Sequence, residues 1–219
     1  MKMIQENKKK LILTSIVILL PIIIGLILWN KLPDKLPTHW NAEGVVDGWS
    51  SKTFAVIGLL GFLFVVHWVC VLASSADPKK QNIEGKVLNV VFWICPIISV
   101  LGATLIYGTA LGMDFKVDKI MLALVGIMFI VIGNYLPKCK QSYTVGIKLP
   151  WTLSDEENWN RTHRLGGKLW VASGFVIILC MLLPTNAMSA VLIIILFSAV
   201  IVPTIYSYQL YRKKEKHGE

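Results

Sequence analysis

The longest water-compatible stretch of the chain is residues 133–170, GNYLPKCKQSYTVGIKLPWTLSDEENWNRTHRLGGKLW. It follows one apolar run at 120–136 and leads into another at 169–184. The stretch contains six Lys or Arg residues, three consecutive acids, three Trp and a His. Such a mixture is typical of a folded segment at a membrane surface rather than of a flexible linker. We therefore interpret the rest of the chain as a scaffold that holds this segment.

The composition places the chain among membrane proteins. Of its 219 residues, 55% are hydrophobic and only 16% are charged, with a mean hydropathy of +0.63, which is outside the range of ordinary soluble domains. A hydrocarbon layer of about 30 Å requires roughly 20 apolar residues in a helix. Six runs meet this requirement: 11–29, 53–73, 87–108, 120–136, 169–184 and 189–210.

The predicted fold class is all-α, a polytopic membrane protein with six transmembrane helices. We expect a structured outer loop at 30–52 and a long cytoplasmic loop at 137–168 that carries a short surface helix. The predicted division is an N-terminal membrane domain over 1–110 and a C-terminal membrane domain over 111–219.

The distribution of positive charge predicts the orientation. With six spans both termini lie on one side, and most of the 22 Lys and Arg residues fall on that side. The positive-inside rule therefore places both termini in the cytoplasm. We interpret these charges as topology signals that contact the lipid bilayer, with nucleic-acid binding as the weaker alternative, so no direct nucleic-acid partner is predicted. The four scattered cysteines are interpreted as small apolar fillers, neither disulfides nor metal ligands.

The outer loop at 30–52 should lie folded on the outer membrane surface, with tryptophans at the headgroup level. His39, Glu43 and Asp47 recur every four residues, which would align them on a helix. Gly44 and Gly48 argue against a helix, and zinc sites usually need more His or Cys. No metal site is therefore predicted.

Within the spans, Pro21, Pro96 and Pro203 predict bent helices. His67 in the second span is expected to reach the interface or a backbone carbonyl. The loop at 74–86 reads as a plain connector.

A helix is predicted to start near Asp155. Ser154 and Glu157 have the spacing of a capping box, in which each side chain bonds the other residue's backbone. On this helix Glu157 pairs with Arg161, and Trp159 lies over His163. The low apolar content predicts a helix lying along the inner membrane surface with Trp159 dipping into the membrane. A turn at Gly166 and Gly167 would then lead into the fifth span.

The residues do not favour an enzyme. His163 with Glu156 or Glu157 could act as acid and base, but the sequence has no nucleophile elbow, HExxH motif, phosphate-cradling glycine loop or acidic metal cluster. We predict no catalytic residues, no cofactor and no metal.

The long polar stretch resembles the signature of the SdpI family of bacterial membrane proteins, in which a GN pair is followed by a GIRTPWTL-like string, a W and a THR triplet. The matching residues here are Gly133, Asn134, Gly146, Ile147, Lys148, Leu149, Pro150, Trp151, Thr152, Leu153, Trp159, Thr162, His163 and Arg164. The outer sequence LPTHWNAEGVVDGW resembles an N-terminal domain of uncharacterised function that is often fused to this signature. Lys148, Leu149 and Ser142 replace the expected Arg, Thr and Asn, and a Lys cannot reproduce a bidentate Arg contact.

The resemblance implies a membrane protein of immunity and signalling. The family's best known member gives resistance to a secreted killing peptide and holds a transcriptional repressor at the membrane. Mapped onto the predicted topology, the cytoplasmic residues that would bind the repressor are Asn134, Gly146, Lys148, Pro150, Trp151, Thr152, Trp159, His163 and Arg164. The outer residues that would bind the peptide toxin are His39, Trp40, Asn41, Gly44, Asp47 and Trp49.

A second class of function stays open. Three bent helices and His67 could line the path of a small membrane transporter, or the chain could be a lipid-associated envelope factor. A transporter should show a continuous polar stripe through its spans, whereas the sequence shows isolated polar residues.

Overall fold

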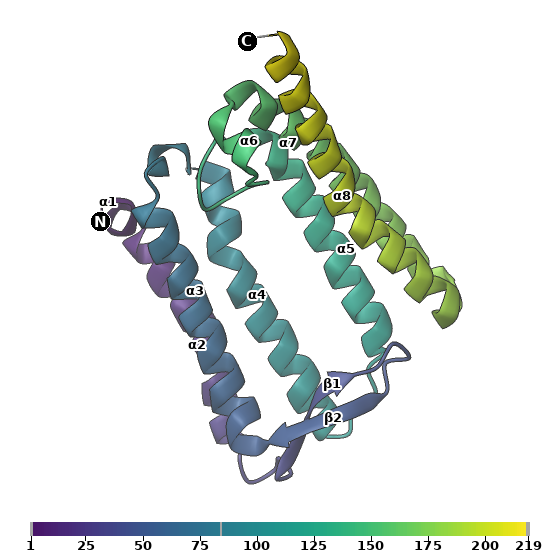
Figure 1. Cartoon of the computed structure of the whole chain (residues 1–219). Helices are drawn as coiled ribbons and strands as arrows, with labels where there is room; N and C mark the ends of the chain where they lie inside the picture. The colour runs from purple at the N-terminus through teal and green to yellow at the C-terminus, as the bar shows by residue number, and fades with distance from the viewer. Residues whose placement is uncertain (1, 84, 218–219) are drawn as a thin grey trace. The chain divides into compact units, whose positions relative to one another are not determined.

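The computed structural model describes residues 2–83 and 85–217 (Figure 1). Over these residues, six helices are long and apolar enough to cross a membrane, and the other regular structure includes a two-stranded sheet. The predicted class, a helical multi-pass membrane protein, is confirmed. The chain forms two compact units: unit 1 is Met1–Ser75 with Leu88–Ile120, and unit 2 is Ala76–Val87 with Met121–Glu219. The predicted domain boundary at residue 110 stays a prediction.

The elements follow each other along the chain in this order. The first half contains α1 (Lys2–Glu6), α2 (Lys8–Ile27), β1 (Lys35–Trp40), β2 (Val46–Ser51), a π-helical turn (Phe54–Gly58), α3 (Leu59–Ala76), a 3-10 turn (Lys80–Asn82) and α4 (Gly85–Ala110). The second half contains α5 (Val117–Tyr135), a 3-10 turn (Leu136–Lys138), α6 (Pro150–Ser154), α7 (Glu156–Leu179), a 3-10 turn (Cys180–Leu182) and α8 (Thr185–His217).

In unit 1 the loop at 30–52 contains a β-hairpin, which connects α2 to α3 (Figure 1). The strands β1 and β2 pair antiparallel, from Lys35 opposite Ser51 to Trp40 opposite Val46. The Asn41 side chain closes the turn by accepting from the backbone N–H of Glu43 and Val45. The prolines and glycines of this loop predict a folded segment without a helix. The pairing of the two strands satisfies the backbone groups of the loop in place of helical hydrogen bonds.

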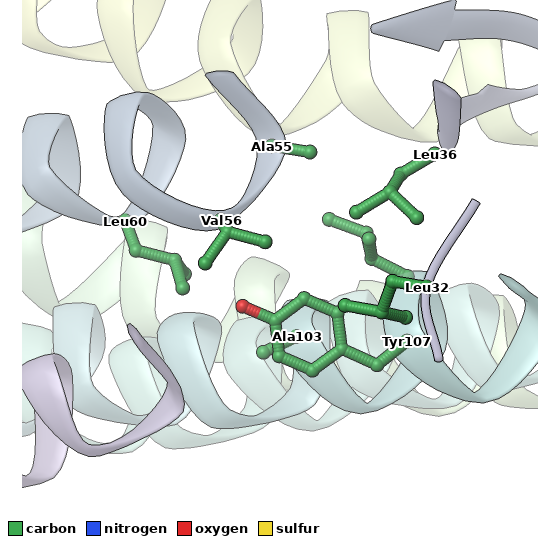
Figure 2. Close-up of a cluster of buried hydrophobic side chains, with 8 residues drawn as sticks. Leu32, Leu36, Ala55, Val56, Leu60, Ala103 and Tyr107 are labelled. Carbon is green, nitrogen blue, oxygen red and sulfur yellow. The ribbon is translucent and has the colours of Figure 1, made fainter. Parts of the chain in front are cut away.

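The hairpin is joined to the helices of unit 1 by an apolar core. Its buried residues are Leu32, Leu36, Ala55, Val56, Leu60, Ala103, Ile106 and Tyr107 (Figure 2). Lys52 follows β2 and donates from Nζ to the carbonyls of Trp29 (3.2 Å) and Leu32 (2.8 Å). These contacts order the ends of the hairpin against the helices that it connects.

His67 does not reach the interface or a backbone carbonyl, so that prediction is wrong. The side chain is fully buried in unit 1, and its Nε2 lies 3.2 Å from Oγ1 of Thr14 in α2. A hydroxyl on a neighbouring helix pairs with one ring nitrogen, while Nδ1 is buried without a hydrogen-bond partner among the described residues. The chain stays helical through Pro21, Pro96 and Pro203.

In unit 2, α5 and α7 pack closely through two pairs of glycines. A Cβ on Gly126 would lie 2.8 Å from the carbonyl oxygen of Gly174, and one on Gly133 would lie 2.9 Å from that of Gly167. Small residues permit such approach between membrane helices. The predicted turn at Gly166 and Gly167 is wrong: α7 runs unbroken from Glu156 to Leu179, so the expected surface helix and the fifth span are one helix.

Candidate functional site

The polar stretch folds into a compact structure in unit 2, which we call the platform and define as residues 77–82, 139–164 and 207–214. Trp159 of α7 lies at its centre, fully buried, and its Nε1 donates to the carbonyl of Cys139 (2.8 Å). The expectation that Trp159 dips into the membrane is wrong. Its ring stacks on His163, as the spacing predicted, with centroids 4.0 Å apart.

His163 ties α7 to the loop before α6. Its Nε2 accepts from the backbone N–H of Ile147 (2.9 Å), and its Nδ1 donates to the carbonyl of Trp159 (2.8 Å). A backbone N–H can only donate and a carbonyl can only accept, so the imidazole is neutral with its proton on Nδ1. Gly146 passes directly over the two rings with φ of +119°. A Cβ there would lie 2.5 Å from the His163 Nε2, so only glycine fits.

Thr152 and Ser142 organise the loop itself. The buried Thr152 accepts at Oγ1 from the N–H of Leu149 (2.9 Å) and lies 2.9 Å from the carbonyl of Ile147. The bond from Leu149 satisfies a backbone N–H at the start of α6. Ser142 donates to the carbonyl of Val145 (2.8 Å) and closes a turn that places Tyr143 at the surface.

The loop after α3 is part of the platform, so its interpretation as a plain connector is wrong. The Asp77 carboxylate is buried and accepts from the N–H of Tyr143 (2.9 Å) and the hydroxyl of Thr144 (2.8 Å). Gln141 accepts from Lys79 Nζ and donates from Nε2 to the carbonyl of Thr152 (2.8 Å). Charge-assisted hydrogen bonds from the loop at 77–82 thus hold residues 139–149, which we call the signature loop, in place.

A buried network of hydrogen bonds joins α7 to α8. Asn158 donates from Nδ2 to the carbonyl of Ser207 (2.9 Å), while its Oδ1 accepts from the hydroxyls of Ser207 (2.7 Å) and Thr162 (3.0 Å). All three residues are buried. Such fully satisfied polar groups fix the register of two apolar helices.

The α7 start is confirmed near Asp155, but the cap is Asp155 rather than the predicted Ser154. Its carboxylate accepts from the N–H of Glu157 (2.9 Å) and pairs with Lys214 of α8 at 3.0 Å. Lys214 also pairs with Glu157 (3.0 Å), and the predicted pair of Glu157 with Arg161 is confirmed at 2.8 Å. Burial raises the pKa of Asp155, but the bonds from Lys214 and from backbone N–H groups outweigh it and leave that pKa below its ordinary value.

The predicted cytoplasmic site residues divide into two groups. Thr152, Trp159 and His163 are buried and Gly146 packs on them, so these residues build the platform. Asn134, Lys148, Pro150 and Arg164 are exposed, and Trp151 is partly exposed. The structure therefore brings one group together as a core and leaves the other available for contact.

An aromatic surface lies beside the exposed group. Trp151 of α6 has its ring centroid 5.3 Å from that of Tyr208 and 6.2 Å from that of Tyr211, both on α8. Both tyrosines are well exposed, at 42% and 40%. The Trp151 Nε1 has no hydrogen-bond partner among the residues that the structure describes.

The predicted outer residues all lie on the hairpin of unit 1. His39 and Asp47 face each other across β1 and β2, with Nδ1 and Oδ1 2.5 Å apart, and both are exposed. Trp49 is exposed at 58%, whereas Trp40 packs against the apolar core. Asn41 and Gly44 shape the turn, where Gly44 has φ of +76°.

Sequence reasoning missed several residues that hold the platform. These are Asp77, Lys79, Gln141, Asn158, Ser207 and Lys214. The Asp77-Pro78 pair signals a turn, but no local pattern indicates that its carboxylate bonds a loop more than 60 residues away.

Residues 138–207 match the model of the SdpI/YfhL protein family, and residues 16–64 match that of a domain of unknown function, DUF1648. The chain is 26% identical over 208 residues to "Immunity protein SdpI" of Bacillus subtilis (strain 168), covering 94% of this chain and 97% of the relative. No solved structure gives a significant match. The resemblance of this multi-pass membrane protein to the SdpI family is therefore confirmed: the chain carries a DUF1648 segment at 16–64, followed by an SdpI/YfhL segment at 138–207.

Proposed function

We propose that the chain is an immunity protein of the bacterial plasma membrane that protects its cell from a secreted peptide toxin. The similarity to an immunity protein along almost the full length of both chains carries this proposal. In the orientation that we propose, both termini and the platform lie in the cytoplasm and the hairpin lies outside. The excess of Lys and Arg near the termini and in the platform supports this orientation.

The hairpin is the proposed contact for the toxin. Trp49 and Val45 expose 58% and 60% of their surface, and the exposed His39–Asp47 pair lies on the same small sheet. Exposed tryptophan next to polar groups is typical of a residue that anchors a partner. A short amphipathic peptide would find both an apolar and a polar contact there.

The platform is the proposed contact for a cytoplasmic transcriptional repressor. The aromatic surface of Trp151, Tyr208 and Tyr211 has the residue types that dominate binding energy at interfaces. Tyr143 and Lys148 are also exposed on the platform.

Two matched variants test the proposal. The hairpin variant Trp49→Ala and the platform double variant Trp151→Ala/Tyr211→Ala are expressed in cells that are sensitive to purified peptides secreted by the source organism and its close competitors. Survival under each peptide measures resistance, and co-purification of small DNA-binding proteins with the membrane measures recruitment. The wild-type chain should confer resistance, Trp49→Ala should lose it, and the platform variant should keep it while losing recruitment.

The buried residues provide the control for folding. Trp159→Ala removes the centre of the platform and should reduce both readouts together with the amount of folded protein. Unchanged killing by every peptide in cells that contain the wild-type chain would contradict the immunity function. Equal loss of resistance in the hairpin and platform variants would contradict the division between the two surfaces.

A further inference from the structure

A basic pocket lies on unit 2 beside the platform. Its cavity of about 250 Å³ is lined by Arg161, Arg164, Leu165 and Lys168 of α7 and by Tyr206 of α8. The three cations are spaced three, four and seven residues apart, so they share one face of the helix. Among the residues that the structure describes, no acidic side chain lines the pocket.

Two of these cations are available to a ligand. Arg161 is paired with Glu157 at 2.8 Å. Arg164 and Lys168 are both exposed, and neither makes an ion pair or a side-chain hydrogen bond within the described part of the chain. Such a cluster of positive charge is unfavourable by itself and is complementary to an anion.

The face that carries the cations continues into the bilayer. Phe175 and Leu179 follow Lys168 by seven and eleven residues, which places them on the same side of α7, and they expose 57% and 60% of their surface. They lie in the apolar part of a helix that can cross a membrane. On α8, exposed Ile205 and Val202 precede Tyr206 by one and four residues, along the same apolar run. The pocket therefore lies where the charged part of this face of α7 meets its exposed apolar part, which is the arrangement expected at the headgroup level of a bilayer.

We propose that this pocket binds the headgroup phosphate of an anionic phospholipid. Arg164 and Lys168 contact the phosphate, the hydroxyl of Tyr206 donates a hydrogen bond, and an acyl chain lies along Phe175 and Leu179. Arginine suits this role because its planar guanidinium binds two phosphate oxygens at once. Basic pockets between membrane helices bind acidic headgroups by the same chemistry. The proposal does not depend on the immunity function.

The test uses the full chain purified in detergent and titrated with phosphatidylglycerol or with phosphatidylcholine of the same acyl chains. Native mass spectrometry counts bound lipid. The variant Arg164→Gln/Lys168→Gln is compared with Lys140→Gln/Lys216→Gln, which removes the same charge from exposed sites outside the pocket. Loss of each pocket cation should lower the affinity for phosphatidylglycerol about fivefold, so the affinity of the double variant should be about 30-fold lower. The control should stay within about twofold.

Three outcomes would overturn the proposal. Wild-type protein could bind the two lipids equally, or the control variant could lose as much affinity as the pocket variant, which would reduce the effect to general surface charge. Displacement of the lipid by an equal concentration of inorganic phosphate would show that the pocket takes a free anion and no lipid. Equal thermal unfolding of both variants in lipid-free detergent shows that the comparison is made on folded protein.

Discussion

Gly133 of α5 and Gly167 of α7 are in direct backbone contact: a methyl group on Gly167 would lie 2.7 Å from the carbonyl oxygen of Gly133. Replacing Gly133 by Val should therefore force the two helices apart and lower the free energy of unfolding by about 2 kcal/mol. Thermal unfolding in detergent measures the change. Gly102→Val in α4 is the matched control, because no neighbouring atom of the described residues lies within 4 Å of a Cβ at that position. An equal shift in both variants would mean that the loss comes from the valine alone.

Gly146→Ala should damage the platform while leaving the spans folded. The alanine would have to adopt φ of +119° and would place its methyl group 2.5 Å from the His163 Nε2. We expect a loss of about 1–3 kcal/mol and a broken bond between Ile147 and His163. Nuclear magnetic resonance of the labelled imidazole should show loss of the single Nδ1-protonated tautomer. An unchanged imidazole spectrum would contradict the proposed packing.

Asp77→Asn should loosen the signature loop from a distance. The substitution removes the negative charge that accepts from Tyr143 and Thr144, and such charge-assisted bonds contribute about 2 kcal/mol. Hydrogen exchange over 139–149 should accelerate roughly 30-fold. The control is Asp114→Asn, a change of an exposed acid between α4 and α5, which should leave this segment unaffected. Full protection in the Asp77 variant would show that the loop folds without this carboxylate.

Cys139 should resist thiol reagents until the platform opens. Burial raises the pKa of its thiol to about 11, so at pH 7 roughly one molecule in 10,000 carries the reactive thiolate. In a chain whose other three cysteines are alanine, maleimide labelling should be slow. Trp159→Phe should accelerate it, because the indole bond to the Cys139 carbonyl is lost. Ser154→Cys, an exposed position of α6, gives the rate for an open thiol. Equal rates at both sites would contradict a closed platform.

Some features of the fold follow directly from local sequence. The six spans depend on summed hydropathy, which neighbours along the chain determine by themselves. The start of α7 was predicted within one residue, because acids and capping side chains act within a single turn. The stacking of Trp159 on His163 follows from their spacing of four residues.

Other features depend on residues far away in the sequence. Gly166 and Gly167 have the sequence of a turn, but the neighbouring α5 uses Gly167 for close approach within a straight helix. Trp159 has the amphipathic character of a membrane anchor, yet the Cys139 carbonyl satisfies its indole inside the platform. The roles of Asp77 and Asn158 likewise follow from partners that only the folded structure brings near. Local chemistry alone does not distinguish these alternatives.

The length of α8 has a consequence for recognition. Its 33 residues rise about 50 Å, while the hydrocarbon layer measures about 30 Å, so the helix is long enough to extend beyond the lipid. Near its C-terminal end, Lys214 forms ion pairs with Asp155 and Glu157 at the start of α7. These ion pairs join α8 to the start of α7, so Tyr208 and Tyr211 of the aromatic surface lie on a helix that is ordered before any partner binds. A protein that binds there would lose little conformational entropy on the side of this chain, and the speed of its release would be governed by the contacts themselves.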